Sequence, residues 1–180
     1  LKASKDLLKI SKSFDLDFQD LNEFISLNEK RLLGLFSEEN NNFLSQDLKT
    51  NNNLNIPSIT NYFTLFADLN DDKINKKLIA NLKNHNSDEK YFFSSIDPKH
   101  ETFNEKRYWR GPVWINCNWL VYQGLKNKDK EYSYLLKKRT IELIEEKGFH
   151  EYYSCKNGNV MGANNFSWSA SLYLDLVLEN

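Results

Sequence analysis

The sequence predicts an all-α fold, and two observations support this prediction. Apolar residues recur at intervals of three and four along most of the 180-residue chain, which is the spacing that places them on one face of an α-helix. No stretch alternates apolar and polar residues for long enough to predict a β-sheet. The pattern divides the chain into seven helical segments.

The first four segments each carry apolar residues on a single face, so each needs only one packing partner. Asparagine runs at residues 40–42 and 51–53 separate the second segment from the third and are expected to be solvated loops. The four apolar faces consist of Ala3, Leu7, Ile10 and Phe14; of Leu21, Ile25, Asn28, Leu32 and Leu35; of Ile59, Phe63 and Phe66; and of Ile74, Leu78 and Leu82.

The last three segments differ in how much of their surface is apolar. Residues 112–126 and 167–178 are apolar on most sides and must be covered by several neighbours, whereas residues 130–147 carry one stripe and end at Gly148. The stretch before the fifth segment, residues 84–111, has few helical signals. Long irregular segments inside compact domains are usually functional or mobile.

Pro112 is expected to occupy the first position of the fifth helix. A proline lacks the N–H group that would have no partner at that position, and its backbone angle is already helical. Residues 108–111 are then expected to form the loop that leads into this helix.

An aromatic cluster at this helix start is the most informative part of the chain. Tyr108, Trp109, Arg110 and Trp114 fall within seven residues, and Asn118 follows four residues after Trp114, on the same expected helix face. The C–H faces of a pyranose ring pack on indole, and its hydroxyl groups require rigid donors and acceptors such as guanidinium and carboxamide. The residues alone leave a second interpretation open, in which these aromatic rings fill the core and Arg110 caps a neighbouring carbonyl.

The order of these residues resembles the Trp-Arg-Gly-Pro block of family 63 glycoside hydrolases, and two later blocks agree with it. Residues 148–153, Gly-Phe-His-Glu-Tyr-Tyr, resemble the segment that carries the general base of the family. Gly162 and residues 166–170, Phe-Ser-Trp-Ser-Ala, resemble its closing helix. The resemblance covers residues 91–178 in the family's order, and the family shares its clan with the trehalases of family 37.

The resemblance implies an (α/α)6 toroid of antiparallel helix pairs, which needs a chain roughly twice this length. Residues 1–180 would then be the C-terminal portion of a single catalytic domain, an incomplete toroid whose partner is the missing N-terminal half. Residues 112–126 and 167–178 would lie in the inner ring and residues 130–147 in the outer ring. One lateral edge of the inner helices should then be bare and apolar. Within residues 64–68 the chain lacks the proline and glycine that the family more often carries, which affects local loop geometry.

Inverting hydrolysis of a glycosidic bond needs a carboxylic acid that protonates the leaving oxygen and a carboxylate that activates water, roughly 6.5 to 9.5 Å apart. The resemblance assigns the base to Glu151, which is expected in a loop just after Gly148. The residues alone favour an ordinary loop carboxylate at Glu151, and it is the resemblance that favours the base. The acid of the family is an aspartate in an upstream motif, and residues 1–60 contain no match to it. We therefore expect the isolated chain to carry the general base, to lack the general acid and to be inactive.

The resemblance also implies a subsite for a sugar ring. Arg110 has an alternative role there, because a guanidinium pairs with a carboxylate and would hold an acidic aglycone such as glycerate. The residues implied for the subsite are Tyr108, Trp109, Arg110, Trp114, Asn118, Tyr152 and Trp168.

The leading functional hypothesis is an inverting glycosidase acting on small α-glucosides or α-mannosides, such as glucosylglycerate or mannosylglycerate. A trehalase is the alternative enzyme, although the tryptophan-rich signature motif of family 37 differs from the block in this sequence. A non-catalytic sugar-binding or interaction module is a second class, and a helical-repeat scaffold is a third.

Composition bears on the remaining classes of function. The 24 basic and 25 acidic residues are interspersed with a net charge of −1, so the chain lacks the positive field that binds nucleic acid. Cys117 and Cys155 form neither a disulfide framework nor a zinc-binding pattern, and we expect no metal and no cofactor. No run approaches the ~18 apolar residues of a membrane span and no secretory leader is visible. The expected setting is cytoplasmic, with a small carbohydrate as substrate and no membrane partner.

Overall fold

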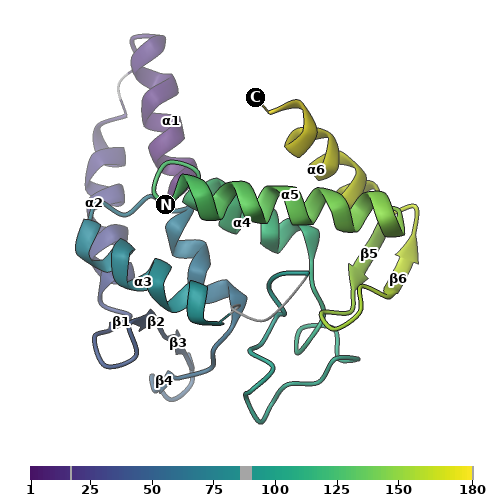
Figure 1. The fold of residues 1–180 in the computed structure, drawn as a ribbon. Helices are drawn as coiled ribbons and strands as arrows, with labels where there is room; N and C mark the ends of the chain where they lie inside the picture. The colour runs from purple at the N-terminus through teal and green to yellow at the C-terminus, as the bar shows by residue number, and fades with distance from the viewer. Residues whose placement is uncertain (17, 86–90, 180) are drawn as a thin grey trace.

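A computed structural model describes residues 1–16, 18–85 and 91–179, and it confirms a mainly helical chain (Figure 1). The helices are α1 Lys2–Ser13, α2 Gln19–Leu33, the 3-10 helix η1 Ile59–Leu65, α3 Asp72–His85, α4 Ile115–Leu125, α5 Lys130–Lys147 and α6 Ser167–Leu178. Three antiparallel hairpins pair β1 Phe36–Ser37 with β2 Asn42–Phe43, β3 Ser45–Gln46 with β4 Asn53–Leu54, and β5 His150–Tyr153 with β6 Val160–Asn164.

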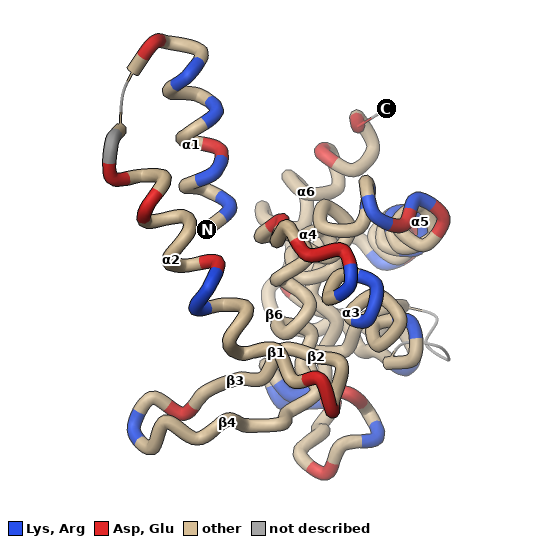
Figure 2. The backbone as a smooth tube through the Cα atoms, turned by 90° about the vertical axis from the view of Figure 1, so that its left-hand side faces the viewer, with Lys and Arg blue, Asp and Glu red and all other residues tan. Residues whose placement is uncertain are grey.

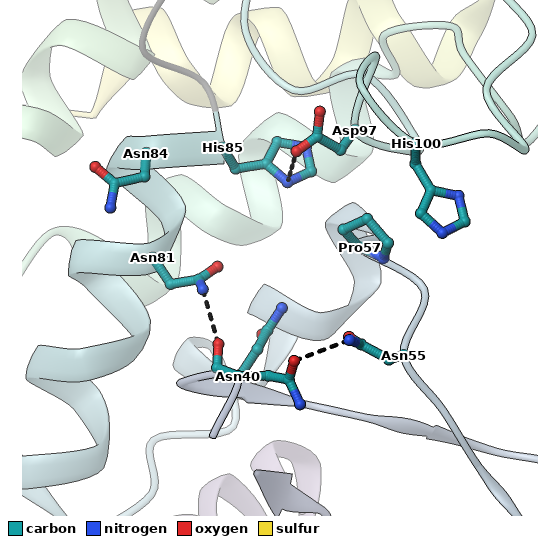
Figure 3. Close-up of a pocket in the computed structure, with 9 residues that line it drawn as sticks. Asn40, Asn55, Pro57, Asn81, Asn84, His85, Asp97 and His100 are labelled. Atoms are coloured by element: carbon teal, nitrogen blue, oxygen red, sulfur yellow. Dashed lines mark hydrogen bonds and ion pairs between the residues drawn. The ribbon is translucent and has the colours of Figure 1, made fainter. Parts of the chain in front are cut away.

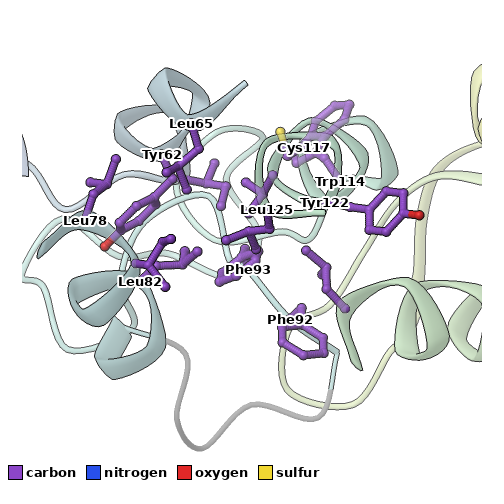
Figure 4. Close-up of a cluster of buried hydrophobic side chains, with 14 of the residues drawn as sticks. Tyr62, Leu65, Leu78, Leu82, Phe92, Phe93, Trp114, Cys117, Tyr122 and Leu125 are labelled. Carbon is purple, nitrogen blue, oxygen red and sulfur yellow. The ribbon is translucent and has the colours of Figure 1, made fainter. Parts of the chain in front are cut away.

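Helix α4 lies at the centre and packs against η1, α5 and α6. This central position explains why α4 is apolar on most sides, because the helix buries residues on most of its circumference. Helix α4 approaches η1 closely at Gly124, where an added Cβ would lie 2.7 Å from the backbone of Leu65. The main core fills the space between η1, α3 and α4, and Figure 4 draws Tyr62, Leu82 and Phe93 within it.

The prediction that Pro112 begins the fifth helix is wrong. Helix α4 begins at Ile115, with Trp114 as its N-cap in an extended conformation. Val113 forms antiparallel bridges with both Ser94 and Tyr153, so the chain around it is extended. Long-range pairing therefore prevails over the local preference of proline for a helix start.

Two of the expected loops contain strands. The asparagine runs at residues 40–42 and 51–53 lie in or next to the β1–β2 and β3–β4 hairpins, and Glu151 lies in strand β5 rather than in a loop. The strands have only two to five residues each, which is too short for alternation to be detected.

Apolar side chains are exposed on the helices at the two ends of the chain. Helices α1 and α2 form a hairpin that stands out from the rest, and α6 lies on the other side of α4 (Figures 1 and 2). The exposed apolar side chains of these helices are Leu7, Ile10, Phe24, Leu27, Trp168, Leu174, Val177 and Leu178.

Charged residues of both signs are dispersed over the described backbone, on α1, α2 and α5 alike (Figure 2). In the part of the chain that the structure describes, no helix combines the length and the apolar character required to cross a bilayer.

Two neighbouring positions of α6 test the exposed face. Val177 is 47% exposed and Leu176 is fully buried. We expect Val177→Lys to raise the soluble yield and to change the free energy of unfolding by no more than about 0.5 kcal/mol. We expect Leu176→Lys to lower that free energy by more than about 3 kcal/mol, because it buries an unpaired charge. Urea unfolding of both variants checks this, and equal effects would contradict the assigned orientation of α6.

His85 gives the fold a pH dependence. Its side chain is 2% exposed, and burial lowers its pKa below the ordinary value even though Asp97 opposes this effect. The neutral ring is therefore favoured in the folded chain, so its stabilising contribution is present above the unfolded pKa and is lost as the pH falls below it. We expect the free energy of unfolding to decrease from pH 7.5 to pH 5 and this decrease to be smaller in His85→Gln. Denaturant unfolding across that range measures both, and identical pH profiles would contradict the assignment.

Candidate active site

Backbone pairing joins the loop before α4 to strand β5. The Val113 N–H donates to the Tyr153 carbonyl at 2.8 Å, and the Tyr153 N–H donates to the Val113 carbonyl at 3.0 Å. Both side chains are fully buried. The pairing places residues 108–114 beside residues 150–153, although 40 positions separate Val113 from Tyr153 in the sequence.

Three aromatic rings form a stack at this junction, and a fourth meets it edge on. The rings of Trp109 and Trp114 are nearly parallel at 4.3 Å between centroids, and Tyr152 stacks on Trp114 at 4.8 Å. Tyr108 meets Trp114 and Tyr152 edge to face. Trp114 is buried and its indole N–H donates to the Tyr108 carbonyl at 3.0 Å, whereas Trp109 is 49% exposed. The stack is therefore anchored at Trp114 and presents part of the Trp109 indole to solvent.

The Glu151 carboxylate lies at the edge of the stack and is held by two donors. The Tyr108 hydroxyl donates to Oε1. The Ala163 N–H donates to Oε2 at 3.1 Å. The hydrogen bond to Glu151 raises the pKa of Tyr108 above its ordinary value, so this hydroxyl keeps its proton at neutral pH.

A β-bulge creates the position of Glu151. His150 pairs with Asn164 and Tyr152 with Met161, so Gly162 and Ala163 together face the single residue Glu151. Gly162 has φ of +74°, and a Cβ there would lie 2.6 Å from Glu151 Oε2. The glycine therefore permits both the backbone conformation and the approach of the carboxylate. The signal in the sequence is an isolated glycine in a strand, which indicates a bulge.

The turn before β5 is held by buried polar contacts. The Tyr153 hydroxyl donates to the Gly148 carbonyl at 2.7 Å and accepts from the His150 N–H at 3.0 Å. Ser169 of α6 donates to the His150 carbonyl at 2.6 Å. These bonds fix β5 against both α5 and α6.

The structure brings five of the eight predicted site residues into mutual contact, namely Tyr108, Trp109, Trp114, Glu151 and Tyr152. Arg110 is adjacent in the loop and exposed, and its guanidinium has no hydrogen bond or ion pair with the described residues.

Asn118 and Trp168 lie apart from this cluster. Asn118 is fully buried and its side chain donates to Thr140 of α5 at 3.3 Å, so it points toward α5. Trp168 is half exposed at the start of α6, where it packs near Phe166. The expected shared face of Trp114 and Asn118 is absent, because Trp114 precedes the helix.

Comparison with solved structures finds the same fold in glycoside hydrolases. A family 63 mannosylglycerate hydrolase from Thermus thermophilus, in complex with glucose, superimposes with a TM-score of 0.90 at 30% identity over 97% of this chain and 45% of its own. The same enzyme in complex with Tris and D-glycerate gives a TM-score of 0.90 over 97% and 43%. A neutral trehalase from Saccharomyces cerevisiae gives 0.74 at 17% identity over 98% and 36%, which shows a shared fold alone.

Comparison with curated sequences gives the same result. The chain is 32% identical to a mannosylglycerate hydrolase of Thermus thermophilus over 96% of its own length and 42% of that relative. It is 32% identical to a glucosylglycerate hydrolase of Mycolicibacterium hassiacum over 45% of its length and 18% of that relative. The chain therefore spans less than half the length of these relatives. Because residues 1–169 match the family described as "Mannosylglycerate hydrolase MGH1-like glycoside hydrolase domain", the chain belongs to this glycoside hydrolase family.

Proposed function

We propose that the chain is the C-terminal portion of the catalytic domain of an inverting glycoside hydrolase that acts on mannosylglycerate, glucosylglycerate or a similar small α-glycoside. The observation that supports this function most is the Glu151 carboxylate, held by Tyr108 and Ala163 beside the exposed Trp109 indole. Glu151 is the general base in this proposal.

The hydrogen bonds from Tyr108 and Ala163 are compatible with Glu151 acting as a general base. Each carboxylate oxygen accepts one hydrogen bond, which orients the group and leaves further lone pairs for a water molecule. Water bound there would lose a proton to Glu151 as it attacks the anomeric carbon on the face opposite the leaving group.

The aromatic stack is the proposed platform for the sugar ring. Stacking on Trp114 restricts the Trp109 indole, so little side-chain entropy is lost when a pyranose packs on it. Arg110, beside Trp109 and free of other ion pairs among the described residues, is placed to pair with the carboxylate of a glycerate aglycone. The D-glycerate complex of the Thermus enzyme agrees with such an aglycone. Asn118 and Trp168 are retained as proposed subsite residues, although the Asn118 side chain bonds to Thr140 and the Trp168 ring packs near Phe166 rather than on the stacked rings.

The general acid is proposed to lie outside this chain. The relatives are more than twice as long, and residues 1–60 carry no counterpart of the aspartate motif of the family. In the proposed toroid, α4 and α6 belong to the inner ring and α5 to the outer ring. The segment that completes the ring would cover the exposed faces of α1 and α6 and supply the acid.

Substitution of the base tests the function directly. In the longer protein proposed to contain this chain, we expect Glu151→Gln to lower kcat on mannosylglycerate or glucosylglycerate by about 10²- to 10⁴-fold, because the amide cannot accept the proton of water. Glu142→Gln, an exposed carboxylate on α5, is the matched control and should leave kcat unchanged. The 180-residue chain alone should show no turnover. If the 180-residue chain hydrolysed the substrate and Glu151→Gln abolished this turnover, the proposal that the acid lies outside the chain would be contradicted. If the short chain and the longer protein both bound sugar without turnover, a non-catalytic module would be favoured.

The bulge gives a second test. We expect Gly162→Ala to lower kcat at least about tenfold, because a Cβ at that position collides with the Glu151 carboxylate and the positive φ disfavours alanine. The same Cβ would lie 2.7 Å from the Tyr152 ring, which stacks on Trp114, but it does not meet Trp109, so we expect KM to change less than kcat. Ala163→Gly keeps the N–H donor to Glu151 and is the matched control. Equal losses in the two variants would argue against the bulge as the element that positions Glu151.

A further inference from the structure

A cavity lies away from the aromatic stack, between the end of α3, the β1–β2 hairpin and the segments around Pro57 and Asp97 (Figure 3). Its volume is about 420 Å³, within the range of small-molecule sites. It shares no lining residue with the stack or Glu151. Its lining residues are Asn40, Asn42, Asn55, Pro57, Asn81, Asn84, His85, Asp97 and His100.

The walls of this cavity are held by their own hydrogen bonds. Asn81 donates to the Asn40 carbonyl at 3.0 Å and accepts from the buried Tyr62 hydroxyl at 2.6 Å. Asn55 donates to the Asn40 side chain at 2.8 Å. The Asp97 N–H donates to the Pro57 carbonyl at 2.9 Å. The cavity is therefore formed before any ligand binds.

Several polar groups in the walls have no partner among the described residues. Asn42 is 5% exposed; its Oδ1 accepts from the Phe43 N–H, and its Nδ2 donor is unused. Asn55 Oδ1 and both polar atoms of the Asn84 amide are also unused. His100 Nδ1 pairs with Thr102 and leaves Nε2 free. Donors and acceptors are thus present in comparable numbers.

We propose that this cavity is a second binding site for a neutral polyhydroxylated molecule, a sugar or polyol. Each hydroxyl both donates and accepts, which matches a wall of carboxamides. The lining residues include no lysine or arginine, so a phosphate would find no counter-charge. Asp97 is the single carboxylate in the lining, and among the described residues no three His, Cys, Asp or Glu side chains are grouped closely enough to hold a metal ion. The proposal does not depend on the chemistry of Glu151.

Glucose binding to the 180-residue chain, followed by saturation-transfer NMR and calorimetry, tests the proposal. In a Trp109→Ala background, which removes the indole platform, we expect glucose to remain bound. Adding Asn55→Ala and Asn84→Ala, both at exposed positions, should weaken that binding about tenfold through the loss of hydrogen bonds. Asn52→Ala, an exposed asparagine outside the cavity, is the matched control and should have no effect.

Other outcomes separate this site from the proposed active site. Loss of all glucose binding in Trp109→Ala would overturn the second site and leave the proposed function intact. Glucose binding that is indifferent to Trp109→Ala but removed by the two asparagine substitutions would support the second site and count against the indole platform. Binding of inorganic phosphate or Ca²⁺ that competes with glucose at the asparagine residues would overturn the proposed ligand class.

Discussion

The backbone pairing of Val113 is the constraint on which the rest of the structure depends. Val113 bridges Ser94 on one side and Tyr153 on the other, and the neighbouring Ser95 donates from its N–H and its hydroxyl to the Pro112 carbonyl. All these groups are buried, where an unpaired N–H or C=O would cost about 1 to 3 kcal/mol. A slip of one residue would turn alternate side chains to the opposite face. The pairing thus fixes both the position and the register of the aromatic loop relative to Glu151.

The same pairing connects the proposed active site with the asparagine-rich cavity. The bridge between Ser58 and Ile96 continues the line of pairing from Val113 towards Pro57 and Asp97, which line the asparagine-rich cavity. Pro112 is compatible with this arrangement because it takes part only through its carbonyl, as an acceptor, so the N–H that proline lacks is not needed. Both sites therefore lie on one rigid framework, although they share no side chain.

Periodicity in the sequence was sufficient to find the helices and insufficient to find the site geometry. Seven predicted segments correspond to α1–α6 and η1, since one-sided apolar spacing is a local property of the chain. The contact of Tyr108 with Glu151 joins residues 43 positions apart, and no local rule connects them. The same-face argument for Trp114 and Asn118 failed because Val113 pairs with β5 and delays the helix start. Gly162 was visible as a motif residue, but its bulge depends on the opposing strand.

The composition of α6 links folding to catalysis in the proposed toroid. This helix buries Ser169 and Leu176 against the described chain but exposes Leu174 and Val177. Covering an aliphatic side chain of this size contributes roughly 1.5 to 3 kcal/mol, so the exposed face is a strong driving force for association with the completing segment. That segment is also the proposed source of the general acid. Association with that segment would then bury the apolar face of α6 and place the general acid opposite Glu151 at the same time. A chain whose apolar face stays exposed to water would have the base but not the acid.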